Sequence, residues 1–237
     1  MYGISKKEAS TLFSLLTKHK SSITEVRLFG SRARGDYKKN SDFDLAVSFC
    51  KPAKNDIIAD FECSDFPYTV DILDYNIIRN KKLQAHIKRD EKIIFYVKEG
   101  KIMITSEQIK YKWEDYSRAL DRLCEALKKD TSLDDMYVDA TIQRFEFTFE
   151  LGWKLLKAVL EYDGIEANSP RGSIREGFKA DLIENADKWL NMLEKRNLST
   201  HTYDEETALE IYNAVKNECF SLLVKFRDDM KARFFEQ

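Results

Sequence analysis

The chain has 237 residues, of which 43% are hydrophobic and 34% charged, and its formal net charge is −2. This composition is typical of a soluble globular protein, and the near-neutral charge excludes nucleic-acid binding through overall basicity, so any such site must be a local patch. No apolar run approaches the roughly 20 residues of a membrane span, and the amino terminus lacks a signal-peptide core. Four scattered cysteines without CxxC spacing indicate reduced thiols and a cytoplasmic protein.

The first 100 residues alternate between helical and strand patterns. Ser5 and Glu8 have the spacing of a capping box at the start of the helical stretch "ISKKEASTLFSLLTKH". Short helices are predicted in "DIIADFEC" and "KKLQAHIKRD". Runs rich in β-branched and aromatic residues predict strands at 23–29, 42–49, 68–75 and 93–97. Together these elements predict a small α/β domain over residues 1–100.

The second half of the chain shows only helical patterns after a predicted junction at residues 98–108. Apolar residues recur at helical spacing from Ile109 to Leu127. Gly164 is the stop signal of a second helix that starts near Leu133. Further helices are predicted at 173–183, 185–196 and 205–230, the last with Asp204 as its N-cap. We therefore expect a bundle of about five helices over residues 107–232, and an α+β class for the whole chain.

The stretch "LFGSRARGDYKKNSDFDLAV" joins two apolar runs through a small-residue turn and then presents two acids. Asp42 and Asp44 lie two residues apart in a predicted strand, so their side chains share one face while Phe43 points to the core. Like charges this close repel each other unless a cation lies between them. Mg²⁺ accepts carboxylates together with substrate phosphate oxygens, so the pair is a candidate metal site.

A third acid lies in a later predicted strand. Asp71 is flanked by Val70 and Ile72, where an unpaired carboxylate is costly to bury. A neighbouring strand would bring it beside the first two acids, and three carboxylates suit one or two Mg²⁺ ions that activate a hydroxyl and steady phosphates. Asp74, three residues further on, is the alternative third acid. A solvated face of an edge strand is the simpler alternative for the alternating acids.

The turn before the acids suits a phosphate group. Gly30 lets the backbone approach an anion, Ser31 offers a hydroxyl and an N–H, and a helix that starts at Ser31 would present its N-terminus. Arg32 and Arg34 add charge-assisted contacts to a triphosphate. The alternative is a polar turn that binds nothing.

The joint pattern is more specific than its parts. A Gly-Ser pair, ten residues, Asp-x-Asp and a later strand acid resemble the signature of the minimal nucleotidyltransferases of the DNA polymerase β superfamily, over roughly residues 1–100. The resemblance implies that Gly30 and Ser31 lie at the nucleotide phosphates. It implies that Asp42, Asp44 and Asp71 hold Mg²⁺, with Mn²⁺ as a substitute, and that ATP is the substrate.

A second motif, "RNLSTHTY" at residues 196–203, lies where one predicted helix ends and the next begins. His201 suits proton transfer near neutral pH, and Arg196 suits phosphate binding. Composition alone favours a helix C-cap followed by a polar loop. The Arg-x₄-His-x-Tyr spacing resembles HEPN domains that pair with minimal nucleotidyltransferases. "RFEFTFELGWKLLK" and "SPRGSIREGFKADLI" resemble the helical nucleotidyltransferase substrate-binding proteins, over about residues 107–232.

This second resemblance implies a metal-independent ribonuclease that acts on RNA as a homodimer formed through the helical domain. It also implies that the transferase silences the ribonuclease by adding AMP to Tyr203, beside Arg196 and His201. We therefore expect a fused toxin–antitoxin-type protein that modifies itself in cis or across a dimer. One alternative is a transferase that acts on a small molecule or another protein, with the helical domain as a non-catalytic binding module. Another is a structural or regulatory protein with degenerate motifs.

Other residues in the helical half are interpreted as structural. Phe145, Phe149 and Trp153 fall at i, i+4 and i+8 and form a core stripe. Glu146 and Glu150 share another face, either solvated or paired with Arg144 or Lys154, and receive no functional role. His19 and His86 are interpreted as ordinary surface histidines among lysines.

Overall fold

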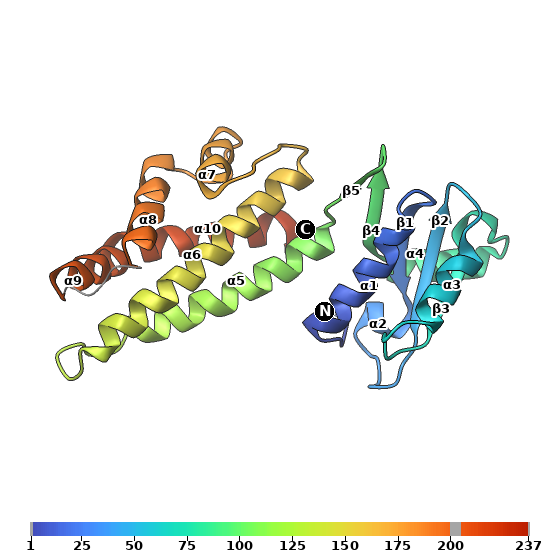
Figure 1. Cartoon of the computed structure of the whole chain (residues 1–237), viewed down its shortest axis with the longest axis horizontal. Coiled ribbons are helices and arrows are strands. Elements are labelled where there is room, and N and C mark those ends of the chain that lie inside the picture. The colour runs from blue at the N-terminus through green and yellow to red at the C-terminus, as the bar shows by residue number, and fades with distance from the viewer. Residues whose placement is uncertain (1, 200–204, 237) are drawn as a thin grey trace. The chain divides into compact units, whose positions relative to one another are not determined.

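The computed structural model describes residues 2–199 and 205–236. It divides the chain into two compact units, residues 1–108 and 109–237 (Figure 1). Each unit has its own hydrophobic core. The first unit mixes helices with a sheet and the second is a helical bundle, so the α+β class is confirmed. Among the described residues, no helix is long and apolar enough to cross a membrane.

The first unit is built on a five-stranded sheet with the order β3-β2-β1-β4-β5. Its strands are β1 (Ile23–Phe29), β2 (Phe43–Phe49), β3 (Val70–Asp74), β4 (Lys92–Lys98) and β5 (Lys101–Met103). The pairs β1–β2, β1–β4 and β4–β5 are antiparallel, whereas β2 and β3 run parallel. The sequence predicted a junction where β5 lies, because a three-residue strand that is mostly exposed carries no hydrophobic period.

Helices cover both faces of this sheet (Figure 1). They are α1 (Lys6–Lys18), α2 (Gly30–Arg34), α3 (Lys54–Glu62) and α4 (Lys81–Asp90), with the 3₁₀ turn η1 (Tyr75–Ile77). Leu45 and Val47 of β2 enter the main core with residues of α1 and α3. Ala46 points to the other face, where it joins a smaller cluster with Ile87 of α4. Because side chains alternate along a strand, Asp44 lies on the same face as Ala46 and α4.

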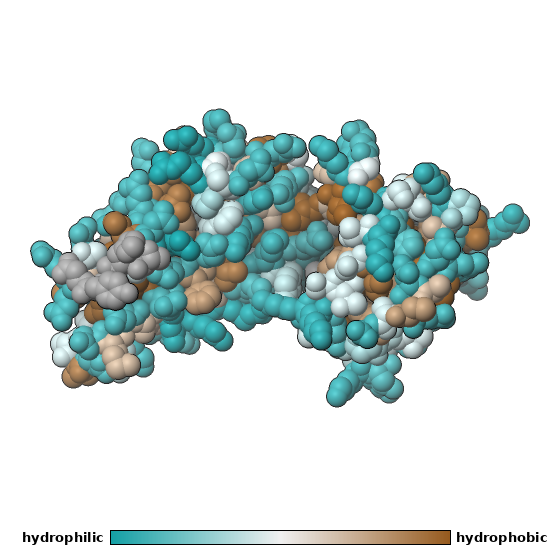
Figure 2. Space-filling view, in the orientation of Figure 1, coloured by the Kyte–Doolittle hydropathy of each residue, from teal (hydrophilic) through white to brown (hydrophobic). Residues whose placement is uncertain are grey.

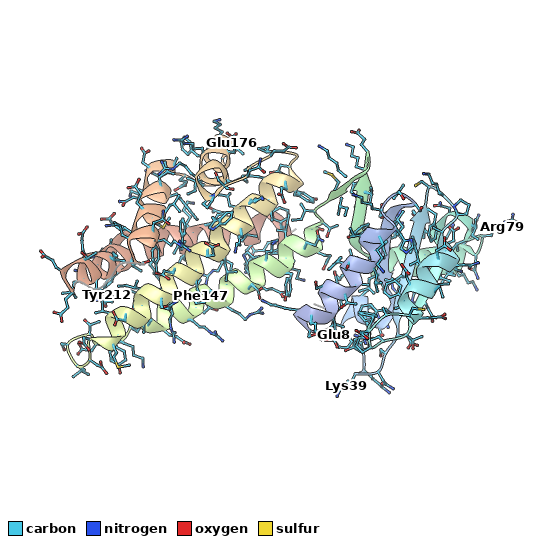
Figure 3. All side chains as sticks on the ribbon, viewed as in Figure 1. Glu8, Lys39, Arg79, Phe147, Glu176 and Tyr212 are labelled. Atoms are coloured by element: carbon cyan, nitrogen blue, oxygen red, sulfur yellow. The ribbon has the colours of Figure 1, made fainter. Side chains whose placement is uncertain are left out.

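The predicted capping box at the start of α1 is confirmed. The Ser5 hydroxyl accepts the Glu8 N–H at 3.2 Å, and the Ser5 N–H donates to the Glu8 carboxylate at 2.6 Å. Figure 3 labels Glu8 at this end of α1. Two N–H groups that the first turn leaves without helical partners are thereby satisfied.

The second unit consists of helices that follow one another along the chain. They are α5 (Ser106–Leu127), α6 (Met136–Tyr162), α7 (Pro170–Lys179), α8 (Ala186–Leu198), α9 (Glu205–Ala214), the π-helical turn η3 (Val215–Cys219) and α10 (Phe220–Phe235). The last predicted helix is therefore interrupted, because η3 changes the hydrogen-bond spacing between α9 and α10 without breaking the apolar pattern. The proposed N-cap Asp204 lies outside the described residues.

The aromatic stripe on α6 is largely in the core of this bundle. Phe145 and Phe149 are fully buried, and the ring of Phe149 lies 6.2 Å from that of Trp189. Phe147, between them in sequence, is 62% exposed and is labelled in Figure 3. Trp153 differs from the prediction, because it is only partly buried and its indole N–H binds a carboxylate. Figure 2 shows the remaining apolar side chains of the visible face scattered among hydrophilic ones.

Candidate functional site

The parallel pairing of β2 and β3 brings two acids into register. Asp44 pairs with Asp71, so the two residues are neighbours about 4.8 Å apart on adjacent strands and share one face of the sheet. Asp42 lies two residues before Asp44, just ahead of β2, so the alternation of side chains along the strand places it on the same face of the sheet. All three predicted acids therefore gather where β2 and β3 begin.

The alternative third acid, Asp74, has a different position. It is three residues beyond Asp71 in β3 and so points to the opposite face of the sheet. Its carboxylate accepts the N–H of Asn76 at 3.0 Å and caps the turn η1. Strand register thus places Asp71, and not Asp74, beside Asp44.

The carboxylates repel one another, and Asp44 shows the effect. Burial and the charges of Asp71 and Asp42 raise the pKa of Asp44 above its usual value, and the charges of Arg34 and His86 offset part of this increase. A cation between the carboxylates would relieve the repulsion.

The all-oxygen donor set fits Mg²⁺, which uses one or two protein carboxylates together with substrate phosphates. Within the described part of the chain, no three His, Cys, Asp or Glu side chains stand arranged as a ready-made metal cage. Asp42 and Asp71 are both exposed, so side-chain rotation alone can reorient their carboxylates.

Gly30 sits directly against the Asp44 carboxylate. Its φ is +71°, and a Cβ atom at this position would lie 2.2 Å from the Asp44 Oδ2 atom. The turn from β1 to α2 therefore requires glycine both for its backbone conformation and for space. The short helix α2 begins at Gly30, one residue before the predicted start at Ser31.

Arg32 does not lie where the sequence led us to expect. Its side chain is 2% exposed and donates to the carbonyl oxygens of Ser41 at 2.6 and 2.9 Å and of Asp42 at 3.2 Å. The guanidinium also lies 4.2 Å from the ring centroids of Phe43 and Tyr68. These partners leave it no open face for a phosphate. Arg32 instead holds the backbone that ends in Asp42.

Arg34, in contrast to Arg32, is exposed, and its charge acts on Asp44. It donates to Asp90 at 2.9 Å and pairs with Asp36 at 3.2 Å. Asp90, at the end of α4, is nearly buried and also accepts from Arg89 at 2.7 Å. Hydrogen bonds from Arg89 and Arg34 hold the pKa of Asp90 far below its usual value, so this carboxylate is ionised and keeps Arg34 in place.

His86 is exposed, as predicted, and belongs to the same neighbourhood. Its Nε2 atom lies 3.5 Å from Asp90. The i, i+4 spacing of His86 and Asp90 on α4 was visible in the sequence. The packing of α4 against α2, which brings His86 near the site, could not be predicted from the sequence.

The helical unit places Arg196 in the last turn of α8. Its Nη1 atom lies 3.3 Å from the Asn197 side chain, and its Nη2 atom lies 3.9 Å from Glu150 of α6. The Arg196 Nε atom is buried and has no hydrogen-bond partner among the described residues. His201 and Tyr203, which follow in the motif, lie outside those residues.

Both units match known protein families. Residues 111–232 match the family described as nucleotidyltransferase substrate binding protein like. The chain belongs to this family. Residues 12–100 match the polymerase beta nucleotidyltransferase family. The protein is therefore a polymerase-β-type nucleotidyltransferase domain fused to a HEPN-like substrate-binding-protein domain, as the sequence motifs predicted.

Individual proteins are similar to parts of the chain. A probable ribonuclease HepT of Haemophilus influenzae is 33% identical over 85 residues, which make up 34% of this chain and 58% of that protein. A Thermus thermophilus crystal structure is 33% identical, with a TM-score of 0.43, over 51% of this chain and 98% of that one. A tri-AMPylated Shewanella oneidensis HEPN toxin in complex with MNT antitoxin is 23% identical, with a TM-score of 0.45, over 52% of this chain and 96% of that one.

Proposed function

We propose that the amino-terminal domain transfers AMP from ATP to a hydroxyl group in a reaction that requires Mg²⁺ or Mn²⁺. The observation that carries this proposal is the alignment of Asp44 with Asp71, with Asp42 beside them and Gly30 against Asp44. A divalent cation, when bound, lowers the pKa of an attacking hydroxyl and neutralises phosphate charge. The carboxylates of Asp42, Asp44 and Asp71 would hold this cation. Arg34, fixed by Asp90, supports the triphosphate.

Gly30 and Ser31 form the phosphate side of this site. The backbone at Gly30 carries no side chain that would hold a phosphate away, and Ser31 contributes its N–H and hydroxyl. The acceptor oxygen forms a bond to the α-phosphorus as the bond to the leaving pyrophosphate breaks. Pyrophosphate departs with the electron pair, and the acceptor proton passes to a carboxylate or to solvent.

The acceptor that the sequence favours is the hydroxyl of Tyr203, in the same chain or in a second copy. In the ribonuclease that we propose for the helical domain, Arg196 binds the RNA phosphate and His201 transfers a proton without a metal. AMP on Tyr203 adds a bulky anion two residues beyond His201 in the chain and competes for the position of the RNA phosphate. A homodimer through the helical domain would bring two such motifs together.

Intact-mass measurement after incubation with ATP and Mg²⁺, followed by peptide mapping, tests this proposal. We expect an AMP adduct on the peptide that contains Tyr203. Tyr203→Phe should lose the adduct and keep ATP binding, and the Asp42→Asn, Asp44→Asn double variant should lose transfer altogether. His201→Ala should lower RNA cleavage by ~10²–10⁴-fold.

Toxicity provides a second readout. Tyr203→Phe and the double aspartate variant should inhibit growth more than wild type does, because neither can install the block. A wild-type protein without an adduct on Tyr203, together with a double variant that cuts no RNA, would contradict self-silencing. That result would favour transfer to a small molecule or another protein, with the helical domain as a binding module.

A further inference from the structure

The guanidinium of Arg34 lies between two carboxylates that differ sharply in exposure. Its Nη1 atom donates to Asp90 at 2.9 Å, and the Asp90 side chain, at the end of α4, is 4% exposed. On another edge of the guanidinium, Nε and Nη2 each lie 3.3 Å from the Oδ2 atom of Asp36. The Asp36 side chain is 63% exposed. One carboxylate is therefore enclosed by the protein, and the other borders solvent.

The contact with Asp90 is firmly held. Asp90 also accepts from Nε of Arg89 at 2.7 Å, and Nε2 of His86 lies 3.5 Å away. Hydrogen bonds from Arg89 and Arg34 keep the pKa of Asp90 far below its usual value, so this carboxylate is ionised at neutral pH. Arg34 is therefore anchored through Nη1 by a charged group that is itself fixed.

The contact with Asp36 is weakly held by comparison. Among the described residues, Arg34 is the cation that pairs with Asp36. An exposed ion pair contributes little to stability, because water and salt screen both charges. The edge formed by Nε and Nη2 can also present two parallel N–H donors to a phosphate, as it does to a carboxylate. Asp36 therefore occupies a position that a phosphate group can take over at little cost.

This edge of Arg34 belongs to the neighbourhood of the candidate transferase site. The charge of Arg34 lowers the pKa of Asp44, which shows that the two groups act on each other. The helix α2 that carries Arg34 starts at Gly30, against the Asp44 carboxylate. A triphosphate carries several negative charges and Asp36 carries one, so Coulomb attraction to Arg34 favours the exchange of one for the other.

We propose that Asp36 is a stand-in for phosphate on Arg34, and that the triphosphate of ATP displaces it from Nε and Nη2 while Asp90 keeps hold of Nη1. This inference rests on the nucleotidyl transfer proposed above. It gives two carboxylates on one arginine opposite effects on the affinity for ATP. Asp90 is a positioning residue that increases the affinity, whereas Asp36 competes with ATP and decreases it.

The affinity for a nucleotide that cannot react tests these two effects. The full chain is titrated, with Mg²⁺ present, with an ATP analogue that has a methylene bridge between its α- and β-phosphates. Asp36→Asn removes the competing charge, and Kd should fall about two- to fivefold, as expected for the loss of one exposed ion pair. Asp90→Asn keeps an oxygen but loses the charge that holds Nη1, and Kd should rise about tenfold. For Asp90→Asn, kcat of AMP transfer should change less than Kd does.

Two controls separate the exchange from general electrostatics, because the loss of any acid favours the approach of an anion. Asp60→Asn removes a negative charge of α3, where Asp60 pairs with His19 at 2.9 Å, and should leave Kd unchanged. In an Arg34→Ala background, Asp36→Asn should no longer tighten binding. Equal tightening in that background, or in Asp60→Asn, would overturn the inference.

The remaining outcomes are also decisive. If Asp90→Asn does not fold, the exposed Asp36→Asn and its cycle with Arg34→Ala decide the question without it. A wild-type chain that does not bind the analogue would remove the transferase proposal and this inference together. Binding by the wild type that Asp36→Asn leaves unchanged or weakens would contradict the inference alone. A wild type that binds the analogue but transfers no AMP from ATP would contradict the proposed reaction, and the Kd values would still decide the exchange on Arg34.

Discussion

A methyl group at position 30 tests whether the Asp44 carboxylate must lie against the backbone. In Gly30→Ala, an L-residue is forced to a φ of +71°, which costs about 1–2 kcal/mol of folding free energy. The new Cβ would lie 2.2 Å from Asp44 Oδ2, whereas ordinary contacts begin at 3.4 Å, so the carboxylate must move by about 1 Å. If this carboxylate binds the metal as proposed, a displacement of that size should lower AMP transfer by ~10²-fold.

Gly35→Ala is the matched control for this prediction. Gly35 has a φ of +91°, and a Cβ there would meet nothing within 4 Å. The control should lose a similar ~1–2 kcal/mol in urea unfolding and keep AMP transfer within a few-fold of wild type. Initial rates with saturating ATP and Mg²⁺ provide the comparison. A Gly30→Ala protein that transfers AMP at the wild-type rate would refute the placement of Asp44 in the reaction, and equal losses in both variants would show that backbone strain alone is responsible.

Three further predictions concern the same domain. Arg32→Ala should lower the free energy of unfolding by ~3 kcal/mol, because a buried side chain is removed and the carbonyl oxygens of Ser41 and Asp42 lose their donor; a wild-type urea midpoint would contradict this. Because the pKa of Asp44 is raised in the folded protein, the Asp44 carboxylate binds a proton more tightly there than in the unfolded chain. The stability that this proton binding adds is therefore present below pH 3.8 and is lost as the pH rises. Metal-free Asp44→Asn should therefore unfold at higher urea than wild type at pH 7, and this gain should vanish below pH 3.8; the same gain at both pH values would count against it. EDTA should stop AMP transfer and leave RNA cleavage unchanged, and transfer in excess EDTA would exclude the carboxylate site.

Local sequence determined the elements and the motifs of this protein. The capping box of Ser5 and Glu8, the strands that carry the acids and the buried Phe145 and Phe149 all follow from short-range spacing. Such patterns are readable because capping geometry and side-chain periodicity depend on residues only a few positions apart. The Gly-Ser and Asp-x-Asp spacing also predicted the candidate transferase site, since its motif is nearly continuous in the chain.

Tertiary structure alone decided which residues meet. The resemblance already favoured Asp71 over Asp74, but its position beside Asp44 depends on the register between two parallel strands. Arg32 looked like a phosphate ligand, but the packing of rings and carbonyl groups around it made it a buried support. The sequence offered a pairing of Glu150 with Lys154, which the structure confirms, but not the contacts of Glu146 with Ser199 and of Glu150 with Arg196, because these partners lie about 50 residues away and meet the glutamates only where α6 packs against α8. Burial and long-range pairing depend on how the elements pack, and no local period encodes that packing.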